Sequence, residues 1–436
     1  NSNTKGKRWT VFGLTTPSRY HVKQPWRFNS TPTYGTGRGK YSFWWRGLKM
    51  IEYITIDNYK SISALGIRLD KFNCFIGMNG AGKSTILQVF DFISHVMIGD
   101  VDEWLKKRSW EASDIKSKTN KLPFRSFEMG FKLKNGKILN WIILSSLHKK
   151  NSFAERIAIE GENYLRSSEK MGYSIEGKSP KEIAFNYQGS ILSVLKDSEL
   201  PPELIEFRDA MRNMRSLELL SPQLLRKRAR STEDDIGQGG EKLSAFLGTI
   251  KGEKKSALLK VLQKFYPTVT DFRVSNLRSG WKKLIVIEEF EGKKLETEAT
   301  HLNDGLLRIL AILAILAQAS TNHSVILLDE IENGINQEII EILVDTLVES
   351  PQQFIVTTHS PLILNYLSDE VAKKAVQLVY KTPQGETRVR RFFDIPRIEK
   401  KLAIMGPGDA FVDTDLKALT QECIALDNEI MRKENE

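Results

Sequence analysis

The sequence predicts a mixed α/β fold, because short apolar strands alternate with longer segments of helical periodicity. Three of these strands are each followed by residues with a chemical use: a glycine-rich turn, a pair of carboxylates and a histidine. A strand that runs into a glycine-rich turn and then a helix is the context in which proteins bind phosphate. The three strands are expected at residues 69–77, 325–328 and 353–357.

The other elements follow in order along the chain. Apolar and polar residues alternate on both sides of Asn135 and Gly136, which predicts a hairpin and therefore an antiparallel β lobe. No internal repeat is visible, so we expect one fold with a helical insertion at about residues 190–265. The expected bounds are a strand at 51–56, a helix at 83–96, the hairpin at 126–147, helices at 203–219 and 241–265, strands within 272–298 that turn near Gly280 and Gly292, and a helix from Asp304.

The composition is that of a globular protein. The chain has 436 residues, of which 41% are hydrophobic, and this is enough for a buried core. Cys74 and Cys423 are the two cysteines, too few for a disulfide framework, so we expect a cytoplasmic protein. The longest apolar run, at 306–319, contains Arg308 and is shorter than the roughly 20 residues that a membrane span needs. We therefore expect no membrane partner.

The net charge of +10 comes from one end of the chain. Residues 1–49 contain ten Lys or Arg and no Asp or Glu, whereas residues 50–436 contain 54 of each sign. Four tryptophans accompany these basic residues, and such a segment can stack on single-stranded nucleic acid. We favour the simpler interpretation that residues 1–49 are a disordered or non-native tail and that the protein starts at Met50.

The segment from Gly77 to Ser84 reads GMNGAGKS and matches the phosphate-loop motif G-x-x-x-x-G-K-[ST] in full. Its glycines let backbone N–H groups turn toward phosphates, and the following helix adds its positive end. Lys83 can reach the terminal phosphates of a nucleotide, and the Ser84 hydroxyl can bind Mg²⁺. The motif predicts ATP and Mg²⁺ as cofactors, with contacts from Asn79, Gly80, Ala81, Gly82, Lys83, Ser84 and Thr85.

Two later segments can complete the chemistry of hydrolysis. Asp329, at the end of an apolar strand, is placed to hold Mg²⁺, and Glu330 can orient and polarise the attacking water. His359 follows the next strand and can hydrogen-bond the γ-phosphate. The predicted catalytic residues are therefore Lys83, Glu330 and His359.

In this order the motifs resemble the ABC-type ATPases: a phosphate loop, a long insertion, the sequence LNDG at 302–305, Asp329 with Glu330, the sequence ENGIN at 332–336, and then His359. More narrowly, the chain resembles the bacterial branch that contains RecF, SMC and OLD-like proteins, including the ATPase subunits of antiphage systems such as Septu and PARIS. The opening sequence IDNYKS at 56–61 also fits that branch. The resemblance covers residues 50–415, which we expect to form one ATPase domain before a C-terminal helix at 416–436.

The resemblance implies roles for further residues. Asn303, Asp304 and Gly305 would touch the γ-phosphate of ATP bound by the opposite subunit, and residues 332–336 would communicate across that dimer. Asn303 stands where the family has a serine. Gln188 would be a glutamine that contacts Mg²⁺ and water.

Two clusters outside these motifs leave alternatives open. The basic residues at 226–230 can bind nucleic acid, a partner protein or nucleotide, although such runs are usually solvated loops. Asp413 and Asp415 resemble an acidic pair of metal-dependent nucleases, but only 77 residues follow His359, which leaves little room for a nuclease domain.

We therefore expect an ATPase that forms a homodimer or higher homo-oligomer on ATP and controls a separate effector, such as a nuclease, in bacterial antiphage defence. The alternative is a RecF-like clamp that binds DNA in repair or recombination. A transporter motor is disfavoured because about 225 residues separate Gly77 from Leu302, far more than in a transporter head. A scaffold that does not hydrolyse ATP is disfavoured by Glu330.

Overall fold

The computed structural model describes residues 49–146, 153–168, 172–230, 235–322 and 325–435. The basic segment at 1–48 lies outside the described residues, and so does the interpretation of that segment as a nucleic-acid-binding tail. Among the described residues, no helix is both long and apolar enough to cross a membrane.

A mixed sheet forms the centre of the molecule. Its strand order is β16-β15-β3-β14-β13-β9. Five of these strands, β15, β3, β14, β13 and β9, run parallel to one another, so their carboxyl ends meet at one edge, where ligands bind in open α/β sheets. The strands are β3 (Phe72–Ile76), β9 (Arg215–Leu217), β13 (Val325–Leu328), β14 (Gln353–Thr357), β15 (Val376–Lys381) and β16 (Thr387–Arg391).

An antiparallel sheet packs beside this centre, in the order β2-β1-β4-β5-β6-β7-β8. The predicted hairpin is confirmed: β4 pairs with β5 across the turn that contains Gly136, whose φ is +85°. The strands are β1 (Met50–Tyr59), β2 (Ile62–Arg68), β4 (Phe124–Lys132), β5 (Ile138–Ser146), β6 (Phe153–Ile159), β7 (Glu162–Ser168) and β8 (Gly172–Ile175).

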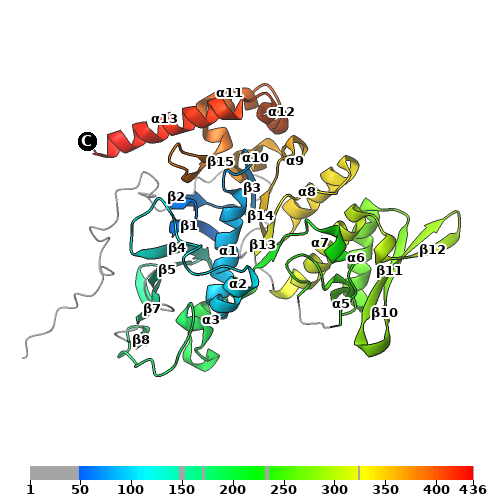
Figure 1. Ribbon diagram of the computed structural model, residues 1–436, viewed down its shortest axis with the longest axis horizontal. Helices are drawn as coiled ribbons and strands as arrows, with labels where there is room; N and C mark the ends of the chain where they lie inside the picture. The colour runs from blue at the N-terminus through cyan, green and yellow to red at the C-terminus, as the bar shows by residue number, and fades with distance from the viewer. Residues whose placement is uncertain (1–48, 147–152, 169–171, 231–234, 323–324, 436) are drawn as a thin grey trace, which may run out of the picture.

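A third, smaller sheet lies on the far side of the molecule with helices α5, α6 and α7 (Figure 1). Its strands are β10 (Val269–Asn276), β11 (Lys282–Phe290) and β12 (Lys293–Glu298). The α-helices are α1 (Lys83–Ile98), α2 (Val101–Lys107), α3 (Pro202–Arg212), α4 (Pro222–Leu225), α5 (Leu243–Leu247), α6 (Gly252–Phe265), α7 (Asp304–Asn322), α8 (Ile340–Glu349), α9 (Pro361–Asn365), α10 (Asp369–Ala375), α11 (Pro396–Leu402), α12 (Pro407–Val412) and α13 (Leu416–Asn435).

The central sheet separates two apolar cores, because successive side chains of a strand point to opposite faces. Phe75, Leu327 and Ile355 face the core that contains α1 and the antiparallel sheet. Their neighbours Cys74 and Val356 face the core that contains α7, α8 and the small sheet. Helix α1 is therefore buried between two sheets, which holds the loop before it in place (Figure 1).

The segment expected to be a helical insertion differs from the prediction in two places. Residues 215–217 form β9 and not the end of a helix, because α3 stops where Asn213 Nδ2 donates to the Asp209 carbonyl, 2.8 Å away, and Leu217 then enters the core beside β13. The helix expected over 241–265 is broken into α5 and α6, since Gly252 adopts a φ of +57°, which a continuous helix does not allow. Strand β9 therefore makes this segment part of the central sheet.

Candidate functional site

The phosphate loop connects β3 to α1, and backbone conformation explains its glycines. Gly77 has φ +143° and Gly82 has φ +115°, a region that side chains other than glycine rarely adopt. A Cβ on Gly77 would lie 2.1 Å from the Val379 carbonyl oxygen, and one on Gly82 would lie 2.3 Å from Thr387 Oγ1. The loop therefore packs directly against β15 and β16, which leaves no space for side chains at these two positions.

A threonine on β16 connects the phosphate loop to the turn between β1 and β2. Thr387 Oγ1 lies 3.0 Å from the Ala81 carbonyl oxygen, to which it can donate, and 2.8 Å from Ser61 Oγ. The Thr387 N–H also donates to the Ser61 carbonyl at 2.7 Å. Ser61 belongs to the IDNYKS segment that contributes to the family resemblance, so this segment supports the loop from behind.

The loop exposes some of its predicted contact residues and buries others. Asn79, Gly80 and Ser84 are exposed, Gly82 and Thr85 are partly buried, and Ala81 is buried. Lys83 Nζ donates to the carbonyls of Gly77, at 2.9 Å, and Met78, at 3.2 Å.

Opposing effects act on the Lys83 ammonium group. Burial lowers the pKa of Lys83, and the carboxylates of Asp329, Glu330 and Glu332 act against that lowering. The ammonium group therefore shares its surroundings with all three acids, which come from a distant part of the sequence.

Ser84 and Asp329 meet at the mouth of the loop. Ser84 Oγ donates to Asp329 Oδ2 at 2.9 Å, although 245 positions separate the two residues. The hydroxyl and the carboxylate are hard oxygen ligands of the kind that Mg²⁺ prefers, and Mg²⁺ completes its coordination with phosphate and water. The described residues contain no group of three or more His, Cys, Asp or Glu side chains that could hold a metal ion.

Thr357, the last residue of β14, connects the two acids after β13. Its hydroxyl donates to Asp329 Oδ1 and accepts a hydrogen bond of 2.8 Å from the Glu330 N–H. Glu330 has a φ of +48°, an uncommon conformation for glutamate that costs roughly 1–3 kcal/mol when the surroundings impose it. Thr357 thus helps to fix the turn that presents the Glu330 side chain. Sequence reasoning missed it because a threonine at a strand end has no distinctive pattern.

Glu332 links the loop after β13 to His359. Its carboxylate accepts hydrogen bonds of 2.8 Å from the Thr358 hydroxyl and from the His359 N–H. His359 is exposed at the same sheet edge as Asp329 and Glu330. The contact between the ENGIN loop and the histidine lies within one subunit.

Arg308 connects α7 to this loop. Its guanidinium donates to three carbonyl oxygens: Asn333 at 2.6 Å, Asp329 at 3.1 Å and Glu330 at 2.5 Å. Burial lowers the pKa of Arg308 to about 10, and the neighbouring carboxylates oppose this shift. Arg308 therefore ties the start of α7 to the backbone of the two acids.

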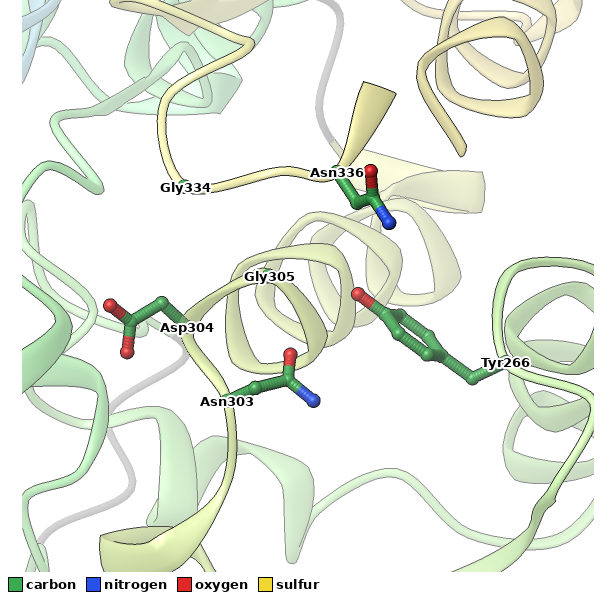
Figure 2. Close-up of a pocket in the computed structure, with 6 residues that line it drawn as sticks. All are labelled: Tyr266, Asn303, Asp304, Gly305, Gly334 and Asn336. Carbon is green, nitrogen blue, oxygen red and sulfur yellow. The ribbon is translucent and has the colours of Figure 1, made fainter. Parts of the chain in front are cut away.

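The predicted signature at 302–305 leads into the first turn of α7. Asn303 Oδ1 accepts a hydrogen bond of 2.7 Å from the Leu306 N–H, which is the geometry of a helix cap. A cavity of about 570 Å³ lies beside this turn, as Figure 2 shows. Its lining residues are Tyr266, Asn303, Asp304, Gly305, Gly334 and Asn336.

The basic cluster at 226–230 is largely engaged within the chain. Arg226 Nη2 donates to the Leu302 carbonyl at 2.9 Å and to the Asp304 carboxylate. Arg228 Nη2 pairs with Glu298 at 2.8 Å, and Arg230 lies 5.9 Å from the centre of the Trp281 ring. Two of the four cations are therefore paired with acids, and Arg226 belongs to the signature region.

Gln188 is not brought to this site. Its side chain makes two hydrogen bonds to Asp102, each of 3.0 Å: Oε1 accepts from the Asp102 N–H, and Nε2 donates to the Asp102 carboxylate. The backbone carbonyl oxygen of Gln188 would lie 3.5 Å from a Cβ on Gly99, which directly follows the last residue of α1. The sixteen-residue α1 begins at Lys83, so Gln188 lies about 20 Å from Ser84 at a rise of 1.5 Å per residue. This arrangement does not place Gln188 among the Mg²⁺ ligands.

Glu218, and not Gln188, lies beside Asp329. It directly follows β9, and the Asp329 N–H lies 3.4 Å from the carbonyl of the preceding Leu217. Gln238 Nε2 donates to Glu218 Oε1 at 2.6 Å. Burial raises the pKa of Glu218, Arg108 opposes that shift, and the charge of Asp329 adds to it. Sequence reasoning missed Glu218 because β9 was read as helix.

Asp413 and Asp415 have structural partners. Asp413 pairs with Lys401 at 2.9 Å, and Asp415 Oδ1 accepts from the Lys417 N–H at 2.8 Å, next to the start of α13. These contacts account for both carboxylates without a metal ion.

The sequence matches one known protein family. Residues 72–365, about two thirds of the chain, match the family described as "AAA domain, putative AbiEii toxin, Type IV TA system". No curated protein sequence matches the chain.

Solved structures of similar fold include SMC head domains. One is bound to the C-winged helix domain of ScpA; it shares 18% identity and a TM-score of 0.50, and the match covers 78% of this chain and 96% of that one. Another, from Pyrococcus furiosus, carries an extended coiled coil and is bound to the C-terminal domain of ScpA, with 15% identity, a TM-score of 0.49 and coverages of 82% and 100%. The head from Thermotoga maritima shares 13% identity and a TM-score of 0.43, with coverages of 78% and 98%. The chain therefore belongs to the matched family of P-loop ATPases and has the fold of an ABC-type SMC head.

Proposed function

We propose that this chain binds ATP with Mg²⁺ and hydrolyses it to ADP and phosphate. The observation that supports this most directly is the hydrogen bond between Ser84 and Asp329, with Lys83 and Glu330 beside it. Four groups that hydrolysis needs thus come together from segments about 245 residues apart.

Each residue has a distinct task in the proposed reaction. Lys83 binds the terminal phosphates, and the loop N–H groups surround them. Ser84 and Asp329 would hold Mg²⁺, which supplies positive charge to the triphosphate. Glu330 accepts a hydrogen bond from the attacking water and orients it toward the γ-phosphate, while His359 contacts that phosphate from the end of β14.

We further propose that two copies of the chain close on ATP. The signature residues Asn303, Asp304 and Gly305 lie at the start of α7, beside a cavity lined by none of the phosphate-loop residues. A contact between the signature and ATP therefore fits best across a dimer, in which each copy covers the nucleotide of the other. Mass action then makes assembly depend on ATP.

The output of the proposed cycle is control of a separate effector in bacterial antiphage defence. The family description names a putative toxin and a type IV toxin–antitoxin system, which supports a role beside a second component. Asp413 and Asp415 are engaged elsewhere, so we assign nuclease activity to a partner and not to this chain. The RecF-like DNA clamp is the alternative outcome of the test.

The first test is ATP hydrolysis by the purified chain. Lys83→Ala should abolish nucleotide binding, whereas Glu330→Gln should bind ATP but hydrolyse it at least a hundredfold more slowly. Glu341→Gln, on the exposed face of α8, is the matched control and should behave as wild type. Full activity of Glu330→Gln would overturn the assignment of Glu330.

The second test is purification of the Glu330→Gln protein with the products of neighbouring genes. An effector whose retention or activity changes relative to wild type supports the regulatory function. A chain that purifies alone and binds DNA more tightly with ATP, in a salt-sensitive manner, supports the clamp instead.

A further inference from the structure

The cavity beside α7 is walled by three separate segments. Tyr266 comes from the end of α6, Asn303 and Gly305 come from the start of α7, and Gly334 and Asn336 come from the loop after β13 (Figure 2). A Cβ on Gly305 would lie 2.9 Å from the Gly334 carbonyl oxygen and 3.0 Å from the Tyr266 hydroxyl oxygen. Glycine at this position thus allows both neighbours to approach the first turn of α7.

Hydrogen-bond donors at the start of α7 make this cavity able to contact a phosphate oxygen. The Asp304 carboxylate points away from Tyr266 in Figure 2 and is paired with Arg226. Asn303 uses its Oδ1 atom to cap α7, so its Nδ2 donors remain for the cavity. Asn336 is engaged with Glu338, whose N–H donates to Asn336 Oδ1 and whose carboxylate accepts a long hydrogen bond of 3.5 Å from Asn336 Nδ2.

The Tyr266 hydroxyl faces this cavity. It makes no hydrogen bond to any other residue that the structure describes. Burial raises the pKa of Tyr266 to about 12, so the phenol is protonated at neutral pH and can donate. The aromatic ring is rigid, and its hydroxyl group extends toward the N-terminal turn of α7 (Figure 2).

We propose that the Tyr266 hydroxyl donates a hydrogen bond to the terminal phosphate of ATP held by a second copy of this chain. It thereby supplies a hydroxyl donor beside Asn303, whose Oδ1 atom is already used to cap α7. The proposal rests on the ATP-driven dimer proposed above and adds a phosphate contact from outside the sequence motifs.

Tyr266→Phe tests this directly, because it removes one oxygen atom and keeps the ring. A neutral hydrogen bond corresponds to about a three- to tenfold effect. We expect kcat for ATP hydrolysis to fall by that factor. In the Glu330→Gln background, the ATP-dependent self-association constant should weaken by the same factor. Nucleotide affinity of the monomer, measured at low protein concentration, should not change.

Tyr366→Phe is the matched control, since Tyr366 is also a partly buried tyrosine but packs near α9, away from the cavity. Its kcat and self-association should equal those of wild type. Thermal unfolding of both variants checks for a merely structural effect, which would shift the melting temperature without changing self-association.

The possible outcomes separate the two proposals. Suppose that Glu330→Gln self-associates with ATP and not with ADP. If Tyr266→Phe then changes neither kcat in the wild-type background nor self-association in the Glu330→Gln background, the Tyr266 assignment is wrong and the dimer stands. If Glu330→Gln does not self-associate with ATP, both proposals fail. A selective loss in Tyr266→Phe with an unchanged melting temperature supports both.

Discussion

Arg308 Nη2 donates a hydrogen bond to the carbonyl oxygen of Glu330, 2.5 Å away. Arg308 lies on the first turns of α7, so the helix that carries the signature is bonded to the residue proposed to orient the attacking water. Any shift of α7 on dimerisation would therefore be transmitted to the backbone of Glu330. This relationship connects the two halves of the proposed composite site.

Replacing Arg308 by Met should lower both stability and catalysis. The carbonyls of Asp329, Glu330 and Asn333 would lose their donors, which we expect to cost about 2–4 kcal/mol of unfolding free energy. Denaturant unfolding measures this cost, and kcat at a temperature where the variant is folded should fall at least tenfold. Arg308→Lys should recover little, because an ammonium group cannot reproduce the planar fork. A folded variant with wild-type kcat would contradict the coupling.

Glu218 and Gln188 give opposite predictions for Mg²⁺. Glu218 lies beside Asp329, so Glu218→Ala should raise the Mg²⁺ concentration needed for half-maximal ATPase activity several-fold and lower kcat. Glu218→Gln should retain part of the activity, since an amide can still bond Gln238. Gln188→Ala, at the other end of α1, should leave the Mg²⁺ requirement unchanged. The reverse result would restore Gln188 as the candidate ligand.

The pair of Arg226 and Asp304 should matter for self-association more than for folding. Arg226→Ala leaves the Asp304 carboxylate unpaired beside the proposed position of a partner's phosphate, and like charges repel. We expect ATP-dependent self-association of the Glu330→Gln protein to weaken about tenfold and to become more dependent on salt. Asp304→Asn combined with Arg226→Ala should recover most of the loss. Arg228→Ala, which breaks a surface pair with Glu298, is the control. Additive effects in the double variant would argue against this pairing.

Lys60 should make stability depend on pH. Burial, and then repulsion from Arg108, lower the pKa of Lys60 from 10.5 to about 8. Between these values the unfolded chain binds the proton and the folded chain does not, so the free energy of unfolding gains from Lys60 as the pH rises through this window. The Trp110 ring, 3.3 Å from Nζ, favours the charged form and limits the gain.

Lys60→Met removes that titration. Its unfolding free energy should therefore rise less than that of wild type between about pH 8 and about pH 10. Lys373→Met, at an exposed position on α10, serves as the control and should follow the wild-type profile. Parallel pH profiles for Lys60→Met and wild type would show that Lys60 does not titrate in this window.

The residues of the phosphate loop and of the two acids were predictable because each lies in a contiguous segment. Glycine conformation, strand periodicity and helix capping are local properties, and they identify GMNGAGKS and the strand before Asp329 without any tertiary information. The hairpin around Gly136 was predictable for the same reason, since its turn is set by two adjacent residues.

Tertiary structure decided which side chains join these motifs. Residues 215–217 have a helical pattern, but the open edge of β13 makes them a strand, and this brings Glu218 to Asp329. Arg308, Thr357 and Tyr266 carry no motif, because groups elsewhere in the sequence give each its role: backbone carbonyls for Arg308, the Asp329 carboxylate for Thr357 and an open cavity for Tyr266. Local sequence therefore sets the phosphate chemistry, whereas packing between separate segments sets what surrounds it, since contacts between residues 22 to 245 positions apart leave no local pattern to read.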